Sequence, residues 1–148
     1  MDELTVHMLN AFNDIFHPHV VATTSWKSFK GFTREFVESL FGINGLNLTL
    51  RPNEWVTTEA CRSDCLSRRR ECLRAAEIGA FVDEHSLTKF IILDDVMSGS
   101  SLFRNEESYG PVKTRTDLFE RAVLVDFEMG LSPRNFTKML DIAKGEWM

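Results

Sequence analysis

Apolar side chains recur with helical spacing in two N-terminal segments of this chain. In residues 2–16 six of them share one face of a helix: Leu4, Met8, Leu9, Phe12, Ile15 and Phe16. This pattern predicts an amphipathic helix that ends before Pro18, because proline cannot continue a helix. A shorter helix is expected after Thr33, whose hydroxyl can cap it, and before Gly42.

Three short segments have the apolar pattern of strands. Residues 19–24 are rich in β-branched side chains, residues 46–51 alternate between apolar and polar, and residues 89–93 form a short apolar run. The dipeptide Asn44-Gly45 predicts a tight turn before the second of these strands. Between the second and third strands, the longest helix is predicted from Thr57 or Thr58 to about Ile78, with Gly79 as its stop.

Residues 94–112 contain clusters of serine, glycine and proline, which predict a long loop. A loop of that length in a compact domain is often functional or disordered. After it, residues 117–129 have apolar positions at helical spacing, capped by Thr116 and stopped by Gly130. Ser132-Pro133 predicts a second helix, Asp141-Ile142 a break, and residues 143–147 the beginning of a third helix.

The segment 117–147 resembles, in part, the helix-turn-helix of phage-repressor-type DNA-binding proteins. The resembling residues are Gly130-Leu131-Ser132, the apolar Phe136, Leu140 and Ile142, and the final Lys144-Gly145-Glu146-Trp147. The resemblance implies that a first helix leads through a turn into a second helix that enters the major groove of DNA. This chain departs from the family pattern because its groove-reading helix would have at most one and a half turns.

These patterns together predict an α+β fold that is predominantly helical, with three or four short strands and helices packed on one side. Residues 1–112 would form the α+β part and residues 113–148 a C-terminal helical unit packed on it, as one domain overall. The chain has 148 residues, 43% of them hydrophobic, which is enough to bury a core. Three clustered cysteines and an acidic N-terminus without a signal peptide favour a cytoplasmic protein with no membrane segment.

The formal net charge of −5 argues against coating nucleic acid through bulk charge, but one predicted helix is locally basic. Its arginines suit phosphate or an acidic partner, and three basic residues near the C-terminus would lie close to the groove. The candidate nucleic-acid or partner-binding residues are Arg62, Arg68, Arg69, Arg70, Arg74, Arg134, Lys138 and Lys144. The alternative for the arginines is a solvated helix face with weak surface ion pairs.

No catalytic, metal-binding or cofactor-binding residues are predicted. Cys61, Cys65 and Cys72 share one face of the long helix, but Cys72 is too far along the axis to join the other two at one ion. Core packing therefore explains the cysteines best. Asp83-Glu84-His85 and Asp94-Asp95 could take part in acid–base chemistry, although short acidic runs are usually loop or strand-end residues.

The leading functional hypothesis is a small cytoplasmic regulator that binds DNA, or a DNA-bound partner, through its C-terminal helices and its arginine-rich helix. The rival is a non-enzymatic protein–protein inhibitor or adaptor of the phage or mobile-element type. It is supported by the acidic balance and by twelve phenylalanines and three tryptophans. A homodimer through the C-terminal helices is also expected, with Trp147 as an anchor.

Overall fold

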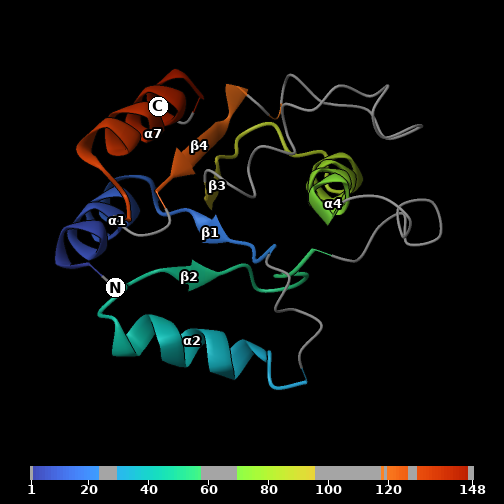
Figure 1. Ribbon diagram of the computed structural model, residues 1–148, viewed down its shortest axis with the longest axis horizontal. Coiled ribbons are helices and arrows are strands. Elements are labelled where there is room, and N and C mark those ends of the chain that lie inside the picture. Colours follow the sequence, from blue (N-terminus) through green and yellow to red (C-terminus); the bar gives the residue numbers. More distant parts are fainter. Residues whose placement is uncertain are drawn as a thin grey trace.

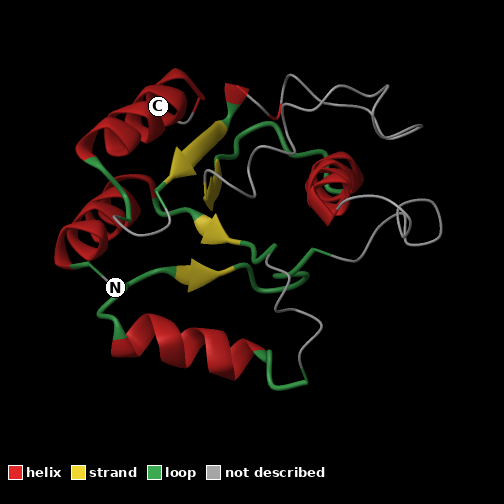
Figure 2. Cartoon of the chain, in the orientation of Figure 1, coloured by secondary structure: helices red, strands yellow, loops and turns green. Residues whose placement is uncertain are grey.

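The computed structural model describes residues 2–23, 30–57, 70–95, 118, 120–126 and 130–146, with the side chains of 70–76, 95 and 146 excepted. Within these residues the predicted α+β, mostly helical fold is confirmed (Figures 1 and 2). The elements in chain order are α1 (Glu3–Phe16), β1 (His19–Val20), α2 (Arg34–Ile43), β2 (Thr49–Leu50), α4 (Arg70–Glu84), β3 (Ile92–Asp95), β4 (Ala122–Val125) and α7 (Pro133–Glu146).

The first two helices form as the sequence predicts, and both are capped at their N-termini. The Asp2 carboxylate accepts a hydrogen bond from the Thr5 amide at 3.0 Å, and the Thr33 hydroxyl accepts one from the Phe36 amide at 3.2 Å. Each cap satisfies an amide that has no partner inside its helix. Helix α2 continues through Gly42 to Ile43, one residue beyond the predicted stop, and the predicted turn follows, with Gly45 at φ +75°.

The strands are short and pair in parallel. In one pair His19 and Val20 of β1 face Thr49 and Leu50 of β2, and a further parallel bridge joins Ala22 to Val56. In the other pair Ile92–Asp95 of β3 face Ala122–Val125 of β4. The first two strands are shorter than predicted, and the third lies later in the chain. It includes Asp94 and Asp95, which were expected in the loop, whereas residues 96–112 lie outside the described residues.

Strand β4 lies between two hydrophobic clusters and contributes to both. Ala122 packs with Ile78 and Val82 of α4 and with Ile92 of β3. On the opposite side Val123 packs with residues from α1 and from α7 and its approach, namely Met8, Phe12, Leu131, Met139 and Ala143. Because successive side chains of a strand point to opposite faces, the helices cover both faces of this strand. The expectation that all helices pack on one side is therefore wrong.

The predicted helix over residues 117–129 is wrong at its centre, because residues 122–125 form β4. Its sequence, Ala-Val-Leu-Val, is apolar at every position. A strand buried on both faces needs such a continuous run, and a short run cannot be distinguished from a buried helix by periodicity alone. Residues 127–129 lie outside the described part of the chain.

The predicted break at Asp141-Ile142 is also wrong, because α7 is one helix of 14 residues from Pro133 to Glu146. Neither residue is a helix breaker, and Ile142 and Ala143 pack into the same cluster as Met139. The first motif helix expected from the helix-turn-helix resemblance is thus the first part of α7, and the expected turn after it is replaced by continuous helix. The C-terminal unit is not purely helical, and its strand pairs with β3 from the preceding part.

The long mid-chain helix ends later than predicted. Helix α4 passes through Gly79 and continues to Glu84, so glycine does not stop it. Gly79 is buried, and the following Phe81 and Val82 are buried too. Burial of this next turn outweighs the cost of glycine in a helix, which is about 1 kcal/mol relative to alanine. The predicted N-terminal part, residues 58–69, lies outside the described residues.

Candidate functional site

The predicted cationic surface is described only in part. Arg62, Arg68 and Arg69 lie outside the described residues, and Arg70 and Arg74 are placed by their backbone in α4 without a described side chain. Arg134, Lys138 and Lys144 all lie on exposed positions of α7. The structure therefore places three of the eight predicted residues on one helix, where their surroundings can be followed.

Two features make this face of α7 less available to an anionic ligand, namely a hydrogen bond that holds one ammonium group and a nearby carboxylate. The ammonium nitrogen of Lys138 donates a hydrogen bond to the backbone carbonyl of Ala122 at 2.6 Å, which ties α7 to β4. The exposed Asp141 is seven residues after Arg134, so the two lie on nearly the same side of the helix. Of the three exposed basic residues of α7, Lys138 is held by this bond to β4, while Arg134 and Lys144 lie on either side of Asp141 in the sequence.

An apolar cavity lies between α2 and the first strand pair. Its volume is about 330 Å³, and it is partly open to solvent. The residues that line it come from β1 and its extension, from β2, and from α2 and its approach: Val20, Ala22, Phe32, Val37, Leu40, Phe41 and Leu50. All seven are apolar, so the cavity can hold a hydrocarbon or aromatic group and offers no charged side chain to orient it.

A row of apolar side chains on the outer side of α2 continues from this cavity. Phe36, Leu40 and Ile43 are spaced four and three residues apart, which places them on one face of the helix. Phe36 is 36% exposed and Ile43 is 80% exposed, while Leu40 also lines the cavity. Phe32 precedes the N-terminus of α2. The centroid of its ring lies 6.3 Å from that of Phe36 and 5.7 Å from that of Trp55. We call Phe32, Phe36, Leu40, Ile43 and Trp55 the α2 surface.

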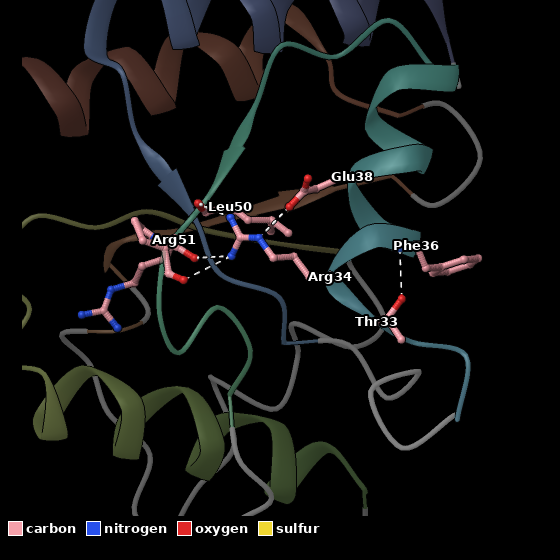
Figure 3. A network of polar contacts seen from close by, with 7 residues as sticks. Thr33, Arg34, Phe36, Glu38, Leu50 and Arg51 are labelled. Carbon is pink, nitrogen blue, oxygen red and sulfur yellow. Dashed lines mark hydrogen bonds and ion pairs between the residues drawn. The ribbon is translucent and has the colours of Figure 1, made fainter.

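Arg34 fixes the position of α2 relative to the end of β2 (Figure 3). Its guanidinium group donates to the backbone carbonyls of Arg51 at 2.8 Å and of Leu50 at 3.3 Å. Its Nε lies 2.6 Å from a carboxylate oxygen of Glu38, one turn further along the helix. The forked group thus holds the helix beside the strand, while Phe36 points away from β2.

A polar cluster connects the segment after β2 to the end of α4. One carboxylate oxygen of Glu54 lies 2.7 Å from Nε2 of His85 and 3.5 Å from Nη1 of Arg51. Phe81 packs against both of these side chains, with its ring 4.3 Å from the imidazole ring of His85 and 5.5 Å from the guanidinium carbon of Arg51. The His85 side chain is 14% exposed, whereas that of Glu54 is 59% exposed.

Sequence reasoning missed both the α2 surface and the Glu54 cluster. The apolar stripe of α2 was recognised, but periodicity alone does not show that one edge of it stays in solvent. His85 was considered as part of the run Asp83-Glu84-His85 and not together with Glu54, because this partner lies some thirty residues earlier in the chain. The sequence gives one weak indication of the polar cluster. Arg51 and Glu54 have opposite charges and flank Pro52 and Asn53, which favour a turn.

Metal binding and membrane insertion can be examined for the described residues alone. Among them, no three His, Cys, Asp or Glu side chains come together as a metal site would require. Within the same ranges no helix is both long enough and apolar enough to cross a bilayer. Cys61 and Cys65 lie outside the described residues, and Cys72 belongs to α4 without a described side chain.

Comparisons of this chain with models of protein families, with characterised proteins and with solved structures found no match.

Proposed function

We propose that this protein is a cytoplasmic, non-enzymatic protein-binding module that takes up an apolar segment of a partner on the α2 surface. The observation that carries the proposal is the apolar cavity of about 330 Å³ that continues into an exposed apolar row on α2. Ile43, which is 80% exposed, lies three residues beyond the cavity-lining Leu40 and adds to the apolar surface that Phe36 leaves in solvent. A partner that covers Ile43 and inserts a side chain beside Leu40 removes that area from solvent.

The shape and chemistry of the surface favour a protein segment over a small molecule. Pockets for small ligands combine apolar walls with a few polar groups that fix orientation, and none of the seven lining residues is polar. Exposed apolar side chains spaced four and three residues apart on one helix can pack against the apolar face of an amphipathic helix from a partner. Aromatic side chains at the rim, here Phe32, Phe36 and Trp55, are the residues that most often dominate the energy of such interfaces.

The proposal is tested by crosslinking from the α2 surface. A photo-reactive amino acid replaces Ile43, and in a second protein it replaces Ile15, which is 56% exposed on α1 and serves as the matched apolar control. We expect a protein partner to crosslink from position 43 and not from position 15. The purified partner should bind the wild type and the variant Ile15→Asp with equal affinity, and should bind Ile43→Asp at least tenfold more weakly.

A partner that binds Ile43→Asp and Phe36→Ser as tightly as the wild type would place the interface elsewhere and refute the proposal. Circular dichroism of each variant shows that a lost interaction does not come from lost folding. The size-exclusion mass of the purified protein, measured in the same buffer, tests the predicted homodimer.

DNA binding remains the second candidate, supported by the exposed cations Arg134 and Lys144 on α7. It no longer rests on a helix-turn-helix, because α7 is continuous and a strand precedes it. Titration of a labelled duplex at increasing salt tests it, since phosphate contacts make affinity fall steeply with salt. If DNA binds, Arg134→Gln with Lys144→Gln should reduce both the affinity and the salt dependence. No binding at low salt removes this candidate.

A further inference from the structure

We propose that Glu54 is a positioning residue that sets Trp55 at the edge of the α2 surface. It would act through His85 and Arg51, and not by touching the partner itself. The inference rests on the proposed function where it concerns partner binding, but the positioning of Trp55 is a property of the free protein.

The backbone around Glu54 is tied to β1 on both sides. The amide of Arg51 donates to the carbonyl of Val20 at 3.0 Å, and the carbonyl of Trp55 accepts from the amide of Ala22 at 2.7 Å. Between these two bonds Pro52 and Asn53 form a bend, and Glu54 has a positive φ of 54°. The direction in which the chain returns to β1, and therefore the position of the Trp55 ring, depends on the conformation of Glu54.

A positive φ is uncommon for a residue with a side chain, because the β-carbon comes too close to the backbone carbonyl oxygen. Such a conformation persists when surrounding contacts hold it. At Glu54 those contacts are the imidazole nitrogen of His85 at 2.7 Å and the guanidinium of Arg51 at 3.5 Å. The side chains of His85 and Arg51 both pack on Phe81, which is buried in α4. The helix therefore provides a fixed anchor for a strained turn.

The contacts that begin at Glu54 lead through Trp55 to the α2 surface. The ring of Trp55 lies 5.7 Å from that of Phe32, and Phe32 both lines the cavity and approaches Phe36. A change of conformation at Glu54 thus moves the aromatic wall of the cavity without changing any residue that lines it. This arrangement predicts that residues remote from the partner set its affinity.

The experiment compares the free wild-type protein with Glu54→Ala, Glu54→Gly, His85→Ala and His85→Gln. The readout is the NMR signal of the Trp55 indole N–H, assigned with Trp55→Phe. We expect the signal to shift in Glu54→Ala, Glu54→Gly and His85→Ala. His85→Gln should largely restore the wild-type signal, because its amide keeps a donor. Glu3→Ala is the matched control, since Glu3 forms an exposed pair with His7 at 3.7 Å on α1 and should leave Trp55 unchanged.

The variant Glu54→Gly distinguishes an effect on the position of Trp55 from an effect on the stability of the protein. Glycine adopts a positive φ without strain, so this variant should be at least as stable as Glu54→Ala while its Trp55 signal still shifts. For a partner identified by crosslinking, the variants that shift Trp55 should bind at least fivefold more weakly than Glu3→Ala. An unshifted Trp55 signal in folded Glu54→Gly and His85→Ala would overturn the inference, whether or not a partner is found. A shifted signal with unchanged affinity would overturn the link to binding while leaving the interface at Ile43 intact.

Discussion

Gly130 is the residue at which the fold depends most directly on a missing side chain. Its φ is +75°, and a β-carbon added there would lie 2.6 Å from the hydroxyl oxygen of Thr5. That hydroxyl accepts a hydrogen bond from the amide of Leu131 at 3.0 Å, and it donates to Asp2 at 3.1 Å. The glycine therefore lets the start of α7 approach the capped start of α1.

We expect Gly130→Ala to lower the free energy of unfolding by about 1–3 kcal/mol, because the change adds both backbone strain and a steric clash. Gly42→Ala is the matched control. Gly42 lies in α2, is exposed, and an added β-carbon there meets nothing within 4 Å. That variant should gain about 0.5–1 kcal/mol. Denaturant unfolding of both proteins measures the difference, and equal effects of the two changes would contradict the assigned role of Gly130.

At Arg34 the hydrogen bonds to β2 should matter more than the ion pair. Arg34→Ala removes bonds from a charged donor to the carbonyls of Leu50 and Arg51, and should cost about 1–3 kcal/mol. Glu38→Ala removes only the half-exposed partner of the pair and should cost less than about 1 kcal/mol. Arg34→Lys should resemble Arg34→Ala, because an ammonium group cannot reproduce the fork. Thermal unfolding of the three variants provides the comparison, and a larger effect for Glu38→Ala would be inconsistent with this reasoning.

At the scale of the elements, sequence patterns correctly predicted the helices that have one buried face and one face in solvent. Helices α1 and α2 have polar and apolar faces and capping residues, so their N-terminal boundaries were predicted within a residue or two. Strand β4 has no polar face because it is buried on both sides, and its pattern was mistaken for a helix. Helix α7 was predicted to break at a point where tertiary packing of Ile142 and Ala143 sustains it. Local patterns cannot contain this information, because it comes from contacts with α1 and β4.

The continuity of α7 leads to a prediction for the element as a whole. In a continuous helix the amides of Ile142, Ala143 and Lys144 bond to carbonyls four residues earlier, as those of Met139 and Leu140 do. We expect hydrogen exchange of all five amides to be slowed to a similar degree. A helix-turn-helix would instead leave the amides after Asp141 exposed to solvent. Fast exchange at Ile142 and Ala143, with slow exchange at Met139, would show that the helix is broken in solution.

At the scale of the whole molecule, the candidate site could not be predicted because its parts are distant in the chain. The α2 surface combines residues 32–43 with Trp55, and the cavity beneath it needs Val20 and Ala22. The polar cluster around Glu54 adds His85 from the end of α4. Each contribution is an ordinary residue in its local sequence. The register of a parallel strand pair and a helix end bring them together, and neither is visible in composition or spacing.

The two hydrophobic clusters predict that the chain does not fold in two independent parts. Removal of residues 113–148 would take Leu118 and Ala122 from one cluster and Val123, Leu131, Met139 and Ala143 from the other. It would also leave β3 without β4. Loss of a single large core side chain costs about 2–5 kcal/mol, so several such losses exceed the 5–15 kcal/mol by which a domain is usually stable.

We therefore expect the fragment 1–112 to show no cooperative thermal transition and poorly dispersed amide signals. The full chain should unfold in one transition, with circular dichroism and tryptophan fluorescence changing together. Met139→Ala in the full chain is the control for a smaller loss, because it empties part of one cluster and keeps both strands. It should lower the midpoint of unfolding while the transition stays single. A fragment 1–112 that unfolds cooperatively would mean that the first cluster is self-sufficient and that α7 is an addition to a complete domain.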